Sequence, residues 1–138
     1  MSELVRFSLS MERPLLDRLE RMAKKSGYAN RSEFVRDMIR DRLVQEEWAA
    51  GGEVLGTATL IYNHHARRLT GKLTDLQHHH HRVVLATTHV HLTEELCVEA
   101  VLMRGKAGHI QEVADLLRQQ RGVLHVALSM SSTGKALV

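Results

Sequence analysis

The chain has 138 residues, of which 43% are hydrophobic and 25% are charged. This composition fits one globular domain or two small ones and excludes a disordered or fibrous protein. No apolar run approaches the roughly 18 residues needed to cross a bilayer, so we expect a cytoplasmic protein without a membrane partner. The net charge of +3 is spread along the sequence and does not by itself indicate a nucleic-acid partner.

The first part of the chain predicts a strand followed by two helices. Residues 5–10 alternate apolar and polar side chains, as in a strand with one buried face. Amphipathic helices are predicted over residues 14–27 and, after a capping-box pattern, over residues 30–43. Because about 45 residues bury too little apolar surface to fold alone, we expect an obligate dimer in which the strands of two chains pair. The outer face of that ribbon would show the polar side chains Arg6, Ser8 and Ser10.

Two glycines then break the helical pattern, and we place a linker at residues 49–53. It separates an N-terminal domain, residues 1–48, from a C-terminal domain, residues 54–138. The hydrophobic pattern of the C-terminal domain predicts strand, helix, strand, strand, helix and strand, and the order βαββαβ is that of a ferredoxin-like sandwich. The predicted fold class is therefore α+β. The predicted segments begin near residues 54, 66, 83, 97, 108 and 123.

Histidine and cysteine carry the strongest chemical signal in the sequence. The single cysteine, Cys97, cannot form an intramolecular disulfide, so it is a buried thiol, a reactive thiol or a metal ligand. On a strand, His89 and His91 point to the same face, and a turn at residues 93–95 brings Cys97 back beside His91. Nitrogen and sulfur donors suit late first-row metals rather than magnesium or calcium. Glu99 is placed to orient a ligand histidine.

A core thiol with two partly buried histidines is the simpler alternative for this cluster. The spacing of His89, His91 and Cys97, close to a run of four histidines at residues 78–81, favours a metal site instead. The isolated histidines are expected to be surface or hydrogen-bonded residues without a ligand role; they are His64, His65, His109 and His125.

The histidine run at residues 78–81 is the richest source of a fourth donor. An extended strand over residues 83–91 spans about 26 Å, so the run lies far from His91 of its own chain. The fourth ligand is therefore expected from a second chain, and a twofold interface would create two equivalent sites. Consecutive helical positions point about 100° apart, so only one or two of the four histidines can face one site.

The motifs Gln77–His81 and Thr88–His91, followed by Cys97 and preceded by the capping box of Asn30–Glu33, resemble those of the nickel-responsive transcriptional regulators, the NikR family. The resemblance covers about residues 4–130. It implies a homotetramer, a dimer of dimers, with ribbon-helix-helix domains on DNA and ACT-type domains at the centre. It also implies one Ni²⁺ per subunit, shared between two chains and held by His89, His91, Cys97 and His78 of the partner subunit.

The same resemblance assigns roles to further residues. Base-reading positions correspond to Arg6, Ser8 and Ser10, of which Arg6 can make a bidentate contact to guanine. A basic loop that touches phosphates in some relatives is partly kept at residues 67–68. Tyr62 and Glu99 correspond to residues near the metal. A second cation site corresponds to Glu33 and Asp37, although carboxylates one helical turn apart are commonly only a solvated face.

The sequence thus predicts a nickel-dependent transcriptional repressor that binds a palindromic operator in double-stranded DNA, with nickel-uptake genes as its natural target. The alternative is a ribbon-helix-helix regulator that responds to cobalt, copper or zinc, or to a small molecule through its ACT-like domain. An enzyme is not expected and no catalytic residue is predicted, because a metal hydrolase needs an open coordination position and a general base, and the sequence has no HExxH motif.

Overall fold

The computed structural model describes residues 3–138. The chain divides into two compact units, one holding the chain up to Leu43 together with Ala136–Val138, the other Val44–Lys135. Among the described residues, no helix is long and apolar enough to span a membrane.

The two predicted helices are α1 (Arg13–Lys25), which belongs to the N-terminal unit, and α2 (Arg31–Ala49), which begins in that unit and ends in the second one. Pro14 occupies the first turn of α1, where its missing N–H costs no hydrogen bond. The predicted cap of α2 is confirmed, because the Asn30 side-chain oxygen accepts the backbone N–H of Glu33 at 2.9 Å. Helix α1 ends at Lys25, two residues before the predicted stop, and α2 runs on to Ala49, the first residue of the expected linker.

The strand predicted at residues 5–10 is not formed in the single chain, whose residues 3–12 have no regular secondary structure. The side chains of Val5, Phe7 and Leu9 are exposed by 71%, 75% and 65%. A lone strand has no neighbour to accept its backbone N–H groups, so one chain cannot form it. The paired ribbon stays a prediction about two chains.

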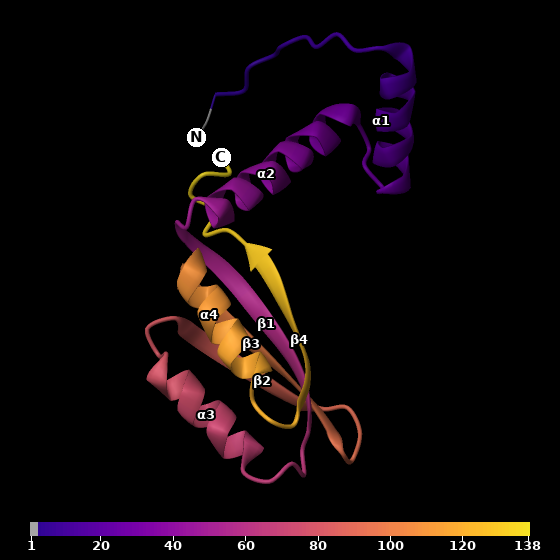
Figure 1. Ribbon diagram of the computed structural model, residues 1–138. Coiled ribbons are helices and arrows are strands. Elements are labelled where there is room, and N and C mark those ends of the chain that lie inside the picture. The colour runs from indigo at the N-terminus through magenta and orange to yellow at the C-terminus, as the bar shows by residue number, and fades with distance from the viewer. Residues whose placement is uncertain (1–2) are drawn as a thin grey trace. The chain divides into compact units, whose positions relative to one another are not determined.

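The unit Val44–Lys135 has the predicted βαββαβ order. Its elements are β1 (Glu53–Asn63), α3 (Leu69–His79), β2 (Val84–His91), β3 (Leu96–Lys106), α4 (Ala107–Arg118) and β4 (Val123–Ser131). The strands form an antiparallel sheet in the order β2-β3-β1-β4, so β1 and β3 are central and β2 is an edge. Helices α3 and α4 lie on one face of the sheet (Figure 1).

The core of this unit lies between the helices and the central strands. Every second residue of β1 from Val54 to Tyr62 is buried, as period-two alternation requires. The end of α2 contributes to the same core: Trp48 is buried, donates its indole N–H to the backbone oxygen of Ser131 at 2.8 Å, and packs over Gly56. In contrast, β2 has only exposed or half-buried residues, so the strand that carries His89 and His91 lies at the rim of the fold.

Candidate metal centre

Strand register brings the predicted metal-site residues together on one face of the sheet. His91 lies opposite Cys97 and His89 opposite Glu99 across the β2–β3 pairing. Cys97 also lies opposite Tyr62 of β1. Opposed residues point to the same side of a sheet, and Tyr62, Cys97 and Glu99 are buried. The site therefore opens on the helix-covered face, where β2 reaches the edge.

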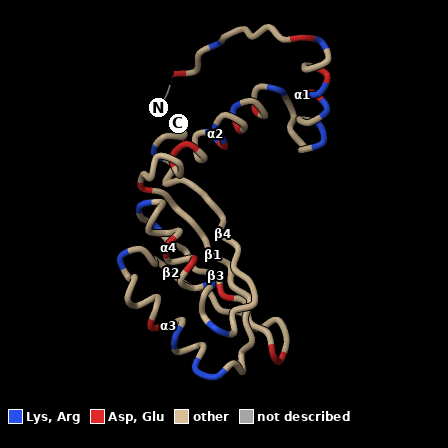
Figure 2. The backbone as a smooth tube through the Cα atoms, viewed as in Figure 1, with Lys and Arg blue, Asp and Glu red and all other residues tan. Residues whose placement is uncertain are grey.

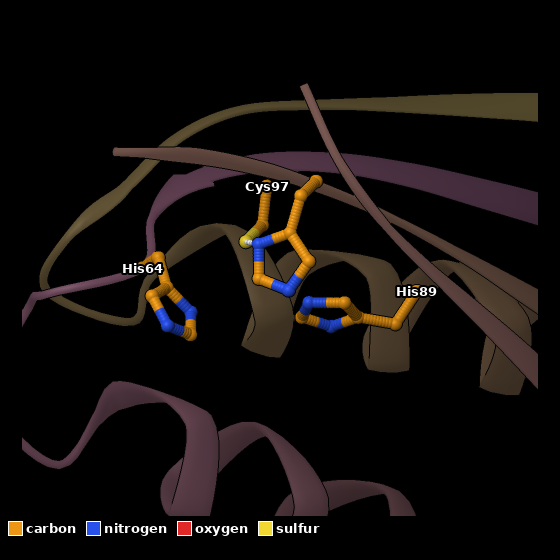
Figure 3. Close-up of side chains that lie close together, drawn as sticks. His64, His89 and Cys97 are labelled. Atoms are coloured by element: carbon orange, nitrogen blue, oxygen red, sulfur yellow. Dashed lines mark hydrogen bonds between the residues drawn. The ribbon is translucent and has the colours of Figure 1, made fainter. Parts of the chain in front are cut away.

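Four side chains that could bind a metal converge there. One donor atom from each of His64, His89, His91 and Cys97 lies within 4.8 Å of the other three. Of these atoms, Cys97 Sγ and His91 Nδ1 lie 3.3 Å apart. Figure 3 shows His64 and His89 on either side of Cys97. The thiol is buried, whereas the three histidines are exposed.

His64 belongs to this cluster although its sequence position predicted a surface residue. It follows directly after β1, and its backbone N–H donates to the Glu95 oxygen at 2.7 Å, which ties it to the β2–β3 turn. Its ring stands 4.9 Å from the His91 ring, centre to centre. In the sequence, the only indication of this role is that His64 directly follows β1. That position places His64 near Cys97 only once β1 is known to pair with β3, the strand of Cys97.

A chain of hydrogen bonds fixes the orientation of His89. The Tyr62 hydroxyl donates to Glu99 at 3.0 Å and also lies 3.0 Å from His89 Nδ1. Because that single proton is used on the carboxylate, the Tyr62 oxygen accepts from His89 Nδ1–H. This tautomer leaves Nε2 of His89 free to bind a metal. Burial, and then the negative charge of Glu99, raise the pKa of Tyr62, so the phenol stays protonated.

The same chain of bonds continues to α3 through residues for which the sequence predicted no role. Gln77 donates from its amide nitrogen to Glu99 at 2.5 Å and accepts from the Thr87 hydroxyl at 2.6 Å. Gln77 immediately precedes the histidine run, so these bonds hold the end of α3 against β2 and Glu99. The sequence signal was weak, because neither residue type is a metal ligand.

His78, the predicted fourth ligand, is at the end of α3, exposed, and outside the cluster of its own chain. Two other histidines of the run turn back to their own backbone: His79 Nδ1 lies 3.2 Å from the Asp75 oxygen, and His81 Nδ1 3.1 Å from the His78 oxygen. A role for His78 therefore requires a second chain and stays a prediction.

The predicted DNA-contact residues and the predicted second cation site lie in the N-terminal unit. Its described segment 3–12 leaves Arg6, Ser8 and Ser10 exposed. At the cation site, Glu33 pairs with Arg36, and Asp37 accepts from Tyr28 at 2.6 Å and Arg40 at 2.9 Å. The bond from Tyr28, followed by that from Arg40, lowers the pKa of Asp37. In the single chain, both carboxylates are thus already paired with side chains of the protein.

A basic pocket of about 560 Å³ lies in the C-terminal unit where the chain enters α3. Figure 2 shows basic segments in the loop that leads into this helix. Such a pocket suits anions, for example backbone phosphates. It is lined by Ala66, Arg67, Arg68, Lys72, Arg121 and Gly122.

The donor set of the cluster fits a late first-row metal. Its four donors are imidazole nitrogens and one sulfur, and none is a carboxylate. Magnesium and calcium prefer oxygen ligands, whereas imidazole and thiolate suit nickel, copper, cobalt and zinc.

Comparison with known proteins also indicates a metal-binding protein. Residues 55–131 match the family described as the NikR C terminal nickel binding domain, and residues 5–46 match the ribbon-helix-helix protein, copG family. A relative from Geobacter metallireducens, with the name "Putative nickel-responsive regulator", is 46% identical over 99% of both chains. Proteins of the same name from Caldanaerobacter subterraneus and Thermococcus kodakarensis are 45% and 42% identical, the former over 97% of this chain and 88% of its own, the latter over 99% of both.

A solved structure of another protein is similar in fold to part of this chain. The uncharacterized protein TM1266 from Thermotoga maritima aligns with a TM-score of 0.51 at 15% identity, covering 56% of this chain and 96% of its own. At this identity the likeness concerns the fold alone.

Proposed function

Because the chain belongs to the family of nickel-responsive regulators, we propose that it is a nickel-dependent transcriptional repressor in which Ni²⁺ binding promotes binding to operator DNA. The observation that carries the proposal is the convergence of His89, His91 and Cys97 on one face of the sheet. These residues supply two nitrogens and one sulfur, donors that nickel accepts. Bound Ni²⁺ supplies a charge and a fixed coordination geometry, and the chain supplies the ligands.

We further propose that His78 of the partner subunit completes the site. Two features of one chain support a shared site. His78 is exposed and outside its own chain's cluster, and β2, which carries two ligands, pairs with a neighbouring strand on one side only. Leu85, Val90 and Leu92 at this edge are exposed, and apolar side chains of this kind commonly mark an interface. One Ni²⁺ per subunit would then join two chains.

The N-terminal unit, within a proposed DNA-binding domain of residues 1–48, would read DNA as a dimer. Pairing residues 5–10 of two chains would bury Val5, Phe7 and Leu9, which one chain leaves exposed. Two such dimers, held by the proposed regulatory domains 54–138 in a cytoplasmic homotetramer, would fit the half-sites of a palindrome. The bases would then be contacted by Arg6, Ser8 and Ser10 of each chain.

Two further sites would contribute to the DNA-bound state. Arg67 and Arg68, which line the basic pocket, would contact backbone phosphates and add affinity without sequence preference. Glu33 and Asp37 would hold a second cation, which must displace Arg36, Tyr28 and Arg40 from the carboxylates.

The decisive experiment is a gel-shift titration of the full-length protein on the nickel-transporter promoter of the source organism, with Ni²⁺, Co²⁺, Cu²⁺ and Zn²⁺ in turn. We expect retardation with Ni²⁺, whereas Cys97→Ala abolishes tight nickel binding and retardation together. His109→Ala, an exposed histidine on α4 outside the cluster, is the matched control and behaves as wild type. Equal responses to Zn²⁺ and Ni²⁺ would remove nickel from the proposal.

A further inference from the structure

The basic pocket at the entry to α3 gathers positive charge from three segments of the C-terminal unit. Arg67 and Arg68 lie in the loop after β1, and Lys72 lies near the start of α3. Arg121 comes from the loop between α4 and β4. Four cations from distant parts of the sequence thus line one pocket.

The chain itself does not neutralise the charge of this pocket. No carboxylate is among the lining residues, and none of the four cations has an ion pair within residues 3–138, the part that the structure describes. By contrast, Arg104 and Arg118 of the same unit pair with Glu53 and Asp115. Like charges that share a pocket repel one another, so a bound anion would relieve this repulsion as well as attract each cation.

The backbone around the pocket is fixed without a ligand. Gly122 packs so closely that a Cβ atom there would lie 2.9 Å from Ala66 Cβ and 3.0 Å from Leu69 Cδ2. This close approach seats the loop that carries Arg121 against the entry to α3. Arg68 has a φ of 61° and is the one non-glycine residue with positive φ among the described residues; such a conformation persists where the surrounding structure enforces it. A pre-formed pocket lowers the ordering cost of binding.

The volume and charge of the pocket indicate which anion it would bind. Its 560 Å³ falls within the range of about 300–1,000 Å³ that is typical of small-molecule pockets. A phosphate monoester carries about two negative charges at neutral pH, about half the charge of the four cations. No aromatic ring is among the lining residues to stack on a base. We infer that the basic pocket binds a free small anion with two or three linked phosphate groups, which it recognises through the phosphates.

Such an anion competes with DNA for the pocket. This consequence rests on the proposed function, in which Arg67 and Arg68 contact backbone phosphates. Both ligands present phosphate oxygens to the same cations, so they cannot occupy the pocket together. The pocket shares no residue with the cluster of possible metal ligands. Free polyphosphate would therefore lower DNA affinity through a site separate from the metal centre.

Isothermal titration calorimetry of the metal-free, full-length protein with sodium tripolyphosphate tests the site. Nickel is left out because tripolyphosphate would chelate it. Inorganic phosphate, at the same ionic strength, is the second probe. Arg121→Ala removes a cation of the pocket, and Arg82→Ala removes an exposed arginine of the same unit outside the pocket. The two variants change the net charge equally, and thermal melting by circular dichroism verifies that both fold.

We expect one tripolyphosphate to bind per chain of the wild type, more weakly as NaCl is raised, and inorganic phosphate to bind less tightly. Arg121→Ala should weaken tripolyphosphate binding about tenfold, the effect of one lost hydrogen bond to a charged group. Arg82→Ala should match wild type. Absence of saturable binding to the wild type, or equal losses in the two variants, would overturn the inference.

Competition is measured by fluorescence anisotropy of a labelled duplex that lacks the operator, because phosphate contacts dominate such binding. The metal-free protein is used, at constant ionic strength. Tripolyphosphate should lower the duplex affinity of the wild type, and about tenfold more should be needed with Arg121→Ala. A duplex affinity unchanged at saturating tripolyphosphate would overturn the competition. The proposed function fails separately, in the gel-shift titration with Ni²⁺, since neither of these assays contains nickel.

Discussion

The two units of this chain differ in how much apolar surface one chain buries. In Val44–Lys135, sheet and helices enclose a continuous core that contains Tyr62 and Cys97. In the described part of the N-terminal unit, only Ala23 and Phe34 are buried, and the apolar residues of segment 5–10 are exposed. One chain can therefore bring its own three proposed metal ligands together, whereas the surface expected to read DNA needs two chains.

The two tyrosines of the chain repeat this contrast on a smaller scale. Tyr28 donates to Asp37 at 2.6 Å in the N-terminal unit, and Tyr62 donates to Glu99 at 3.0 Å in the C-terminal unit. The first pair is part-buried, and the second is buried. Hydrogen bonds strengthen as water is excluded, and an unpaired buried group is costly. Loss of the Tyr62 hydroxyl, which lies 3.0 Å from His89 Nδ1, should therefore have a larger effect than loss of the Tyr28 hydroxyl.

The largest effect is expected from Phe7→Asp, which alters the N-terminal unit, the one expected to need a second chain. In a paired ribbon, each chain would place a carboxylate in the dimer interior, at a cost of several kcal/mol per ion. Dimerisation of the N-terminal units and operator binding should be lost. Fluorescence anisotropy with labelled operator DNA measures this loss.

Nickel binding provides the control for Phe7→Asp, because the triad lies in the other unit. Stoichiometry and affinity for Ni²⁺ should equal those of the wild type. An aspartate variant that still binds the operator at wild-type affinity would show that residues 5–10 do not pair through their apolar face.

A smaller effect is expected from Tyr62→Phe, which alters the unit Val44–Lys135, whose core one chain forms alone. The change removes the phenol oxygen that receives His89 Nδ1–H and the donor to Glu99. Loss of such an orienting partner typically weakens metal binding by about 10–100-fold. Chelator competition with Ni²⁺ measures the change. Tyr28→Phe is the matched control and should leave Ni²⁺ affinity unchanged; equal affinities of the two variants would exclude an orienting role for Tyr62.

The order and type of every element in the C-terminal unit could be predicted, because hydrophobic periodicity is a local property. The convergence of His89, His91 and Cys97 was equally predictable, since a short hairpin connects them. His64 was not, because it reaches the cluster through the long-range pairing of β1 with β3. Gln77 was missed for a related reason: its bond to Glu99 depends on how α3 packs on the sheet.

The N-terminal strand was predicted from the alternation of residues 5–10, yet one chain does not form it. The alternation of apolar and polar side chains indicates which face of a strand would be buried. It does not supply the neighbouring strand that the backbone hydrogen bonds require. The extended α2 has a different cause. Trp48 packs into the core of the C-terminal unit and bonds to Ser131, so tertiary contacts carry the helix past the point where local pattern indicated its end.

The smallest expected effect concerns pH and the half-buried Tyr28. The bond from Tyr28, followed by that from Arg40, lowers the pKa of Asp37 in the folded chain. A depressed carboxyl pKa contributes stability above the unfolded value of about 3.9, and this contribution is lost as pH falls through the folded pKa. Tyr28→Phe removes the larger cause and leaves Arg40, so the pKa of Asp37 should rise part of the way to its ordinary value.

Carbon-detected NMR titration of the Asp37 carboxyl group in wild type and Tyr28→Phe measures this rise. The acid limb of the stability curve of the N-terminal unit should become shallower in the variant, because less stability is linked to ionisation of Asp37. Identical titration curves would mean that Arg40 alone holds the carboxylate. In either outcome Ni²⁺ affinity at neutral pH should not change, since Tyr28 and Asp37 belong to the unit that does not contain the triad.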